Sequence, residues 1–316
     1  MIKENRKKNT PFFSVIINCH NSERYVGEAL KSVLSQTIQD YELIVFDNAS
    51  SDDTAKIVKS FGRDIRYYFS DVKLSLGAAR NKAVMKARGK YIAFLDSDDV
   101  WLPTKLDTQK IILTERGLID EIGLCGSDAF RVSRDLSPLA RYSLSRVRYR
   151  GSVLISLLHD CFIPMSSAVV NRKICIAVGG FDESFEIIEE WDLWIRIAQH
   201  FEVIYYPDCL VKIRFHESNT SKNYVDQNKE ILRMLNAVEL SAKVEQRVID
   251  SARASWFLRY LIVDFFNSFH KTFRYKANLI WQIFIILLRQ PKTCFAVLRS
   301  YFSIRLVRFA FAKYKK

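Results

Sequence analysis

Residues 93–99 read Ala-Phe-Leu-Asp-Ser-Asp-Asp, an apolar run that passes directly into three carboxylates separated by one serine. Such a run predicts a buried strand that ends at Asp96, and apolar strands seldom end in clustered acids without a cation to bind. Side chains alternate along a strand, so a turn at Ser97 is needed before Asp96 and Asp98 can serve one metal ion and its anionic ligand. The alternative is a helix over Val100–Leu113 whose free N–H groups are capped by one of the last two acids.

Short apolar runs alternate with amphipathic stretches on both sides of this segment. We expect strands at Phe12–Asn18, Tyr41–Asp47, Ile65–Ser70 and Tyr91–Asp96, with a helix beginning at Val26 after the first of them. This order predicts an α/β fold in which crossover helices join parallel strands. Ligands of such sheets bind at the carboxyl ends of the strands, which is where the three acids fall.

The later part of the chain is less regular. Residues 128–165 contain six arginines and predict a solvated connection, to which we assign no chemistry. Further strands are expected at Ser166–Val170, Val203–Tyr206 and Leu210–Phe215, and a helix is expected around Trp191–Gln199.

A second strand end is also polar, because Asp47 and Asn48 follow the apolar run Ile44-Val45-Phe46. A carboxylate beside an amide can read the hydrogen-bonding edge of a nucleotide base. The same residue types also form ordinary turns and helix caps, so this signal is weak by itself.

A third polar segment begins a helix expected over Gly77–Arg88, which Gly89 would end as a C′ residue. Gly77 permits close approach of another backbone, and Arg80 in the first turn suits contact with a diphosphate. The alternative is an exposed arginine on an ordinary helix.

Taken together, the segments 14–21, Asp47, Gly77-x-x-Arg80-Asn81 and Asp96-Ser97-Asp98 resemble the family 2 glycosyltransferases over residues 12 to about 220. The resemblance implies a GT-A fold with a mostly parallel sheet, a nucleoside diphosphate sugar as donor, Mn²⁺ or Mg²⁺, and inversion at the anomeric carbon. It also implies the contacts that individual residues make. Those expected to contact the sugar nucleotide are Asn18, His20, Asp47, Asn48, Gly77, Arg80 and Asp96, with Asp96 and Asp98 at the metal.

The first strand departs from the family pattern. It closes with Asn18, Cys19 and His20, where the family usually has Pro or Thr, a small residue and Tyr. The identity of the base that is read is therefore open.

The sequence Glu189-Glu190-Trp191-Asp192 looks like the acceptor-side segment of the family, with Glu190 where an Asp commonly precedes the Trp. Attack by an acceptor hydroxyl needs a general base, and Glu190 is our candidate, with Trp191 contacting substrate. Glu190 lies near the start of a helix, whose dipole favours an ionised carboxylate. The alternative is that these acids only decorate a helix N-terminus.

His216 follows a predicted strand, and in many relatives a histidine near this place closes over the diphosphate or metal. Neutral imidazole is a competent ligand for Mn²⁺ and a poorer one for Mg²⁺. A hydrogen-bonded surface histidine is the alternative.

Basic charge is concentrated in the last part of the chain. Residues 251–316 hold 13 Lys and Arg against one acid, Asp264, while the whole chain has a net charge of +13. The longest apolar run, Ala277–Leu288, would give about 18 Å of helix, against about 30 Å of hydrocarbon in a bilayer. A stripe of Phe295, Leu298, Phe302, Leu306 and Phe309 beside arginines suits helices lying at an anionic membrane surface.

This tail, the lack of a secretory signal and the scattered cysteines together predict a cytoplasmic enzyme that is peripheral on the inner face of the membrane. The alternative is that the tail packs on the catalytic domain or on another subunit. We expect no nucleic-acid partner, because the tail matches no known nucleic-acid module.

We therefore expect a polar segment over 1–10, a catalytic domain over 11–225 and a helical, basic and aromatic region over 226–316. The expected reaction is inverting sugar transfer to a hydroxyl of a glycan or lipid-linked acceptor. Two rivals remain open. A nucleotidyltransferase should show a glycine-rich loop with Lys or Arg near its N-terminus, and we find no such loop in this sequence. A catalytically silent GT-A protein would explain Glu190 in place of Asp.

Overall fold

The structure is a computed structural model that describes residues 10–62, 64–115, 121–142, 149–151, 153–216, 224–241, 243–267 and 282. The chain divides into two compact units, one of Met1–Leu154 with Cys161–His216, the other of Ile155–Asp160 with Glu217–Lys316. The domain boundaries expected from the sequence stay a prediction.

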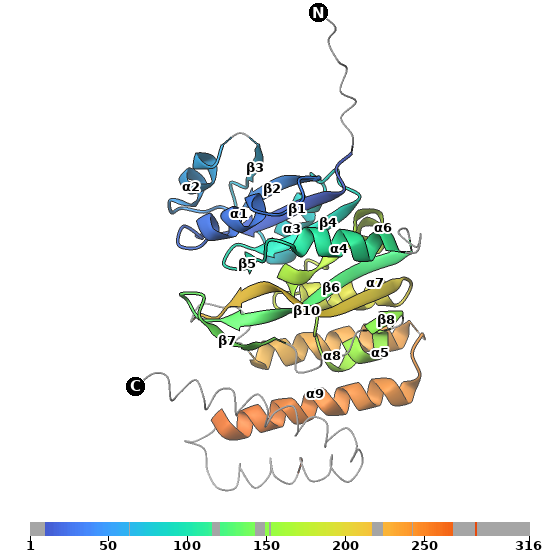
Figure 1. The fold of residues 1–316 in the computed structure, drawn as a ribbon. Coiled ribbons are helices and arrows are strands. Elements are labelled where there is room, and N and C mark those ends of the chain that lie inside the picture. The colour runs from blue at the N-terminus through green and yellow to red at the C-terminus, as the bar shows by residue number, and fades with distance from the viewer. Residues whose placement is uncertain are drawn as a thin grey trace, which may run out of the picture. The chain divides into compact units, whose positions relative to one another are not determined.

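Four parallel strands form one half of the sheet of the first unit (Figure 1). They are β1 (Phe13–Cys19), β2 (Tyr41–Asp47), β3 (Ile65–Phe69) and β4 (Tyr91–Asp96), in the order β3-β2-β1-β4. The predicted bounds of β2 and β4 are confirmed, and those of β1 and β3 differ by one residue. Because β1 pairs in register with both β2 and β4, their polar carboxyl ends meet at one edge.

The other half of the sheet continues from β4 in the order β9-β6-β10-β5. These strands are β9 (Val169–Asn171), β6 (Ile122–Val132), β10 (Glu202–Arg214) and β5 (Val100–Trp101), with β7 (Pro138–Arg141) paired to β6 and β8 (Tyr149–Gly151) to β10. The long ladder between β6 and β10 is parallel, whereas the short β9 and β5 run antiparallel to their neighbours. The mixed α/β architecture expected from the sequence is confirmed.

Three predictions for this half were wrong. The two strands expected at Val203–Tyr206 and Leu210–Phe215 are one strand, β10, whose pairing register shifts between Tyr206 and Val211. The strand expected at Ser166–Val170 begins instead with the 3-10 turn η2 (Met165–Ser167). The segment expected to be irregular from 128 onward starts with the end of β6, where buried residues continue to Val132.

Helices cover both faces of the sheet. Residues of α1 (Val26–Leu34), α2 (Thr54–Ser60) and α4 (Lys105–Thr114) join the main apolar core with alternate residues of β1, such as Val15 and Ile17. Contacts of α3 (Leu76–Val84) with β1 and β2, and of α7 (Glu189–Ala198) with α3, β6 and α6 (Arg172–Ala177), build the second layer. The apolar spacing that predicted α1 arises because its Val26, Ala29, Leu30 and Val33 are fully buried.

The helix expected over Gly77–Arg88 ends at Val84, and Gly89 is not its C′ residue. A Cβ on Gly89 would lie 2.5 Å from the backbone nitrogen of Ser14, and the Gly89 N–H donates to Ser14 Oγ at 2.8 Å. Glycine is needed here because the chain passes against β1 before it enters β4.

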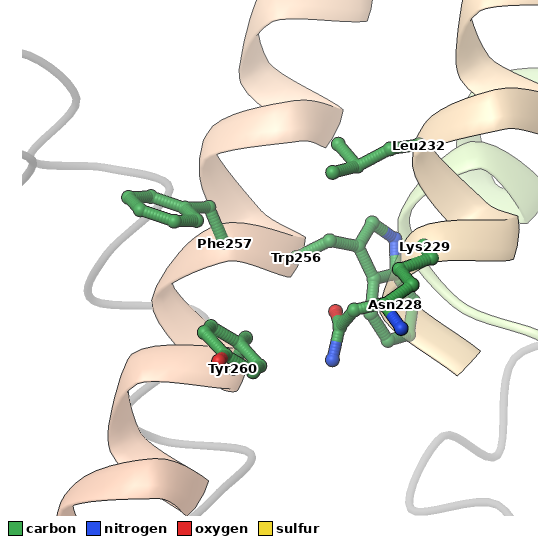
Figure 2. Close-up of a pocket in the computed structure, with 6 residues that line it drawn as sticks. All are labelled: Asn228, Lys229, Leu232, Trp256, Phe257 and Tyr260. Atoms are coloured by element: carbon green, nitrogen blue, oxygen red, sulfur yellow. The ribbon is translucent and has the colours of Figure 1, made fainter. Parts of the chain in front are cut away.

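The second unit contains part of α5 (Leu154–His159), together with α8 (Tyr224–Leu240) and α9 (Gln246–Asn267). Trp256 of α9 donates from Nε1 to the carbonyl of Leu158 at 3.1 Å. A pocket between α8 and α9 is lined by Asn228, Lys229, Leu232, Trp256, Phe257 and Tyr260 (Figure 2).

None of the described helices is both long enough and apolar enough to cross a membrane. The apolar run Ala277–Leu288, apart from Gln282, and the whole stripe from Phe295 to Phe309 lie outside the described residues.

Candidate active site

The acids after β4 form a tight turn, as their spacing requires. The N–H of Asp99 donates to the carbonyl of Asp96 at 3.1 Å. The helix-cap alternative was wrong, because β5 follows the turn directly and α4 begins only at Lys105, after Thr104. Asp98 and Asp99 therefore do not cap a helix, and these two acids need another explanation.

Asp99 braces this turn from inside. Its carboxylate accepts hydrogen bonds from Ser166 Oγ at 2.5 Å and from the Arg214 backbone N–H at 2.9 Å. Burial, followed by the charges of Asp98 and Asp96, raises the pKa of Asp99 well above its ordinary value. Asp99 is thus a structural support, and Asp96 and Asp98 remain the candidates for ligand contact.

Arg80 joins the strand end to the start of α7. Its guanidinium is 4% exposed; Nη2 donates to Asp96 Oδ1 at 3.0 Å and Nη1 donates to Glu189. A carboxylate oxygen of Glu190 lies 4.0 Å from Nη1. Burial alone would lower the pKa of Arg80, but the carboxylates of Glu189, Asp96 and Glu190 raise it. The exposed-arginine alternative was wrong.

The loop before α7 explains how these groups meet. Asn81 of α3 exchanges two 2.8 Å hydrogen bonds with the backbone of Phe181, next to Gly180, whose φ of 68° favours glycine. A Cβ on Gly77 would lie 3.3 Å from the carbonyl oxygen of Asp182. The close approach predicted at Gly77 is therefore an approach of the chain's own backbone, which brings the start of α7 beside Arg80.

Glu190 lies in the first turn of α7, as predicted, and its side chain is 25% exposed. Burial, followed by the charge of Glu189, raises its pKa to about 8, although Arg80 opposes the shift. A carboxylate with a pKa near the working pH can accept a proton from a hydroxyl and later release it. Trp191, in contrast, is only 2% exposed and packs in the interior.

Asp98 and His216 meet on the other side of the turn. His216 Nε2 donates to Asp98 Oδ2 at 2.7 Å, and the imidazole stacks on the ring of Tyr25. Asp96 points to Arg80 instead, and in the described part of the chain no three acidic, histidine or cysteine side chains form a metal-binding group.

One carboxylate and one imidazole nevertheless fit a particular kind of metal site. Mg²⁺ is usually held by one or two protein carboxylates together with substrate phosphates, so the remaining ligands would come from a diphosphate. The pair Asp98 and His216 suits such a shared site for Mn²⁺ or Mg²⁺.

The ends of β1 and β2 hold the residues expected at the nucleotide. Asp47 is fully buried, and its two oxygens accept from the Ser50 N–H at 2.9 Å and from the Tyr67 hydroxyl at 2.7 Å. The Asn48 side-chain amide pairs with the backbone of Leu74 at 2.9 and 3.0 Å. Both side chains therefore shape the loops around this strand end.

Asn18 and His20 lie beside them on β1 and just after it. His20 Nδ1 donates to the Asn48 carbonyl at 2.8 Å, so the ring is fixed by the neighbouring strand end. Asn18 pairs in register with Asp96, and its buried Nδ2 has no hydrogen-bond partner among the described residues. An unpaired amide next to Asp96 is a polar group that could bond to a ligand.

Sequence reasoning missed Glu189, Ser166 and Arg214. Glu189 could have been found from its position next to Glu190, because one acid is enough to interact with the dipole at the start of a helix and a second adjacent acid indicates another role. Arg214 lies two residues before the predicted His216, but nothing in the sequence says that its side chain turns inward. Ser166 carries no local signal, because its partner, Asp99, is distant in the chain.

The fold is that of GT-A glycosyltransferases. A mannosyltransferase from Pyrobaculum calidifontis, solved with GDP-mannose and Mn²⁺, matches 96% of this chain and 87% of its own, with a TM-score of 0.64 and 16% identity. At that identity the match establishes the fold alone.

The sequence comparisons then establish the family. The model described as glycosyl transferase family 2 matches residues 14–117. An uncharacterised glycosyltransferase of Rickettsia typhi is 31% identical over 231 residues, which are 71% of each chain. A β-1,3-glucosyltransferase of Escherichia coli, named for UDP-glucose and a GlcNAc-diphosphoundecaprenol acceptor, is 27% identical over 79% of this chain and 92% of its own. This chain belongs to glycosyl transferase family 2, and the resemblance stated from its motifs is confirmed.

Proposed function

We propose that this glycosyltransferase moves a sugar from a nucleoside diphosphate donor to an acceptor hydroxyl, with inversion and with Glu190 as the general base. The observation that carries the proposal is the cluster of Arg80, Asp96, Glu189 and Glu190. It places a carboxyl group with a pKa of about 8 beside the strand end where donors bind in open α/β sheets.

In the proposed step, the acceptor oxygen attacks the anomeric carbon while its proton passes to a Glu190 carboxylate oxygen. The bond from the anomeric carbon to the phosphate oxygen breaks, and its electron pair leaves with the nucleoside diphosphate. Attack on the face opposite the leaving group inverts the configuration. Arg80 donates to both Glu189 and Asp96 and compensates their negative charges.

Donor binding is proposed at the ends of β1, β2 and β4. Asn18 offers the unpaired amide, while His20, Asp47 and Asn48 shape the surrounding loops. Asp98 and His216 would hold Mn²⁺ or Mg²⁺, which supplies positive charge to the departing diphosphate when it is bound. The named ligands of the relatives, GDP-mannose and UDP-glucose, support a nucleoside diphosphate sugar as the donor class.

The acceptor is proposed to be a lipid-linked or growing surface glycan, as the name of the E. coli relative describes. The basic, aromatic C-terminal region supports a peripheral place on the inner face of the membrane, whose anionic lipids attract basic segments.

The test is product analysis with purified protein, Mn²⁺, UDP- and GDP-sugars, and synthetic sugar-diphosphate-lipid acceptors. We expect one donor to give a product whose new linkage has the opposite anomeric configuration, read from the NMR coupling constant. A product with retained configuration would overturn the mechanism, and failure of every donor would favour the catalytically silent protein.

A further inference from the structure

We propose that Tyr25 and Arg214 are positioning residues that hold Asp98 and His216 ready for a divalent cation. This inference rests on the proposed function of the Asp98 and His216 pair, and it concerns two residues for which the reaction itself gives no role.

Arg214 is the more deeply buried of the two, with 1% of its side chain exposed. Its Nε donates to the carbonyl of Asp98 at 2.8 Å, and Nη2 donates to Glu28 of α1 at 2.8 Å. Nη1 donates to the carbonyl of Arg134, in the hairpin between β6 and β7. One guanidinium therefore ties the turn after β4 to a helix and to a hairpin that are distant in the sequence.

The backbone of Arg214 secures the same turn a second time, because its N–H donates to Asp99 Oδ1 at 2.9 Å. Arg214 thus restrains the peptide plane that follows Asp98, through the Asp98 carbonyl, and also the side chain of the next residue, Asp99. A turn residue has no helix or ladder hydrogen bonds to fix its direction, so these bonds determine where the Asp98 carboxylate points.

Tyr25 links Arg214 to the second ligand candidate. The Arg214 guanidinium carbon lies 4.5 Å from the centre of the Tyr25 ring. The His216 ring packs on Tyr25 with its centre 5.3 Å away and a 26° angle between the planes. His216 then bonds to Asp98, whose carbonyl returns to Arg214, so the contacts form a closed ring of four residues.

Such a ring holds the side chains of both candidate metal ligands, Asp98 and His216, in place before a cation binds. Residues that orient metal ligands typically change metal affinity by about 10- to 100-fold when they are altered. Arg214 also cannot be replaced by lysine without loss, since an ammonium group cannot donate along the three directions that the guanidinium uses here.

The test compares Arg214→Lys and Tyr25→Leu with two matched controls. Tyr25→Phe keeps the ring that stacks on His216. Arg66→Lys alters another arginine that bonds a carboxylate, a carbonyl and a tyrosine, but at the amino-terminal end of β3. The full chain is titrated with Mn²⁺ alone and with Mn²⁺ plus UDP or GDP, and free Mn²⁺ is followed by electron paramagnetic resonance.

We expect the Kd for Mn²⁺ to rise about 10- to 100-fold in Arg214→Lys and Tyr25→Leu, and to stay at the wild-type value in both controls. Thermal denaturation checks that each variant folds. Wild-type Mn²⁺ affinity in folded Arg214→Lys or Tyr25→Leu would overturn the inference, as would equal losses in Tyr25→Phe and Tyr25→Leu. Sugar transfer measured in parallel separates the two proposals, because a wild type that binds Mn²⁺ through this ring without transferring sugar would contradict only the proposed function.

Discussion

Replacing Glu190 with Gln removes the proposed base while it keeps the size and hydrogen-bonding shape of the side chain. General-base catalysis is typically worth about 10²- to 10⁴-fold, so we expect kcat to fall by that factor. Glu190 lies 4.0 Å from Arg80, and it is Glu189 and Asp96 that bond to that guanidinium. The side chains proposed to bind the donor should therefore stay in place in Glu190→Gln, and KM for the donor should change little.

The wild-type enzyme should show the titration of this group. A base must be ionised to accept a proton, and the pKa of Glu190 is raised to about 8. Activity should therefore rise with pH, and kcat/KM should increase about tenfold between pH 7 and pH 9. The residual activity of Glu190→Gln should lack this rise.

The raised pKa of Glu190 also predicts that the contribution of this group to folding stability falls as pH rises, whereas activity increases. A carboxyl whose pKa is raised on folding, here from 4.5, stabilises the fold below about pH 4.5 and loses this contribution as pH rises through 8. Glu190→Gln has no such loss. Its melting temperature relative to wild type should therefore increase from pH 5 to pH 9.

Initial rates with the preferred donor, measured from pH 6.5 to 9 in buffers of constant ionic strength, test the catalytic part. Melting temperatures from pH 5 to pH 9 test the titration independently of turnover. A flat wild-type pH profile, together with near wild-type turnover in Glu190→Gln, would refute the assignment of Glu190 as base.

Three other substitutions test the surroundings of the site. Arg80→Gln should move the pH limb of kcat/KM upward, because it removes the positive charge that lowers the pKa of Glu190; an unchanged or downward limb would contradict the ion cluster. Gly89→Ala should lower the melting temperature, because its Cβ would press on the backbone of β1, and overpacking costs about 1–3 kcal/mol; unchanged thermal denaturation would contradict this close approach. Trp194→Phe removes the 3.1 Å hydrogen bond to the Ile163 carbonyl and should cost about 1–3 kcal/mol, and a melting temperature equal to wild type would show that water replaces the indole.

The first half of the sheet followed from the sequence because its signals are local. Each of β1, β2 and β4 is a short apolar run, and β2 and β4 end where polar residues begin. The second half was harder to predict. A register shift allows β10 to continue through Pro207, and nothing in the local pattern shows that the partner strand β6 tolerates the irregularity.

The same difference between local signals and long-range contacts applies to the residues of the candidate site. Arg80, Asp98 and Glu190 were proposed from motif-like spacing, and their roles stay predictions, whereas Tyr25 and Arg214 are proposed from contacts between residues up to 191 positions apart. Gly77 and Trp191 illustrate the converse. Their residue types suggested ligand contact, but one accommodates the chain's own backbone and the other is buried in the interior.

The most direct test of the account is donor binding at the edge formed by β1, β2 and β4. Thermal shift of wild type and Asp98→Ala would be measured with a panel of UDP- and GDP-sugars, first with Mn²⁺ and then with Mg²⁺. We predict that one donor stabilises the wild type only when metal is present, and that Asp98→Ala loses this stabilisation. Stabilisation that is equal in the two proteins, or absent with every donor and both metals, would contradict the account.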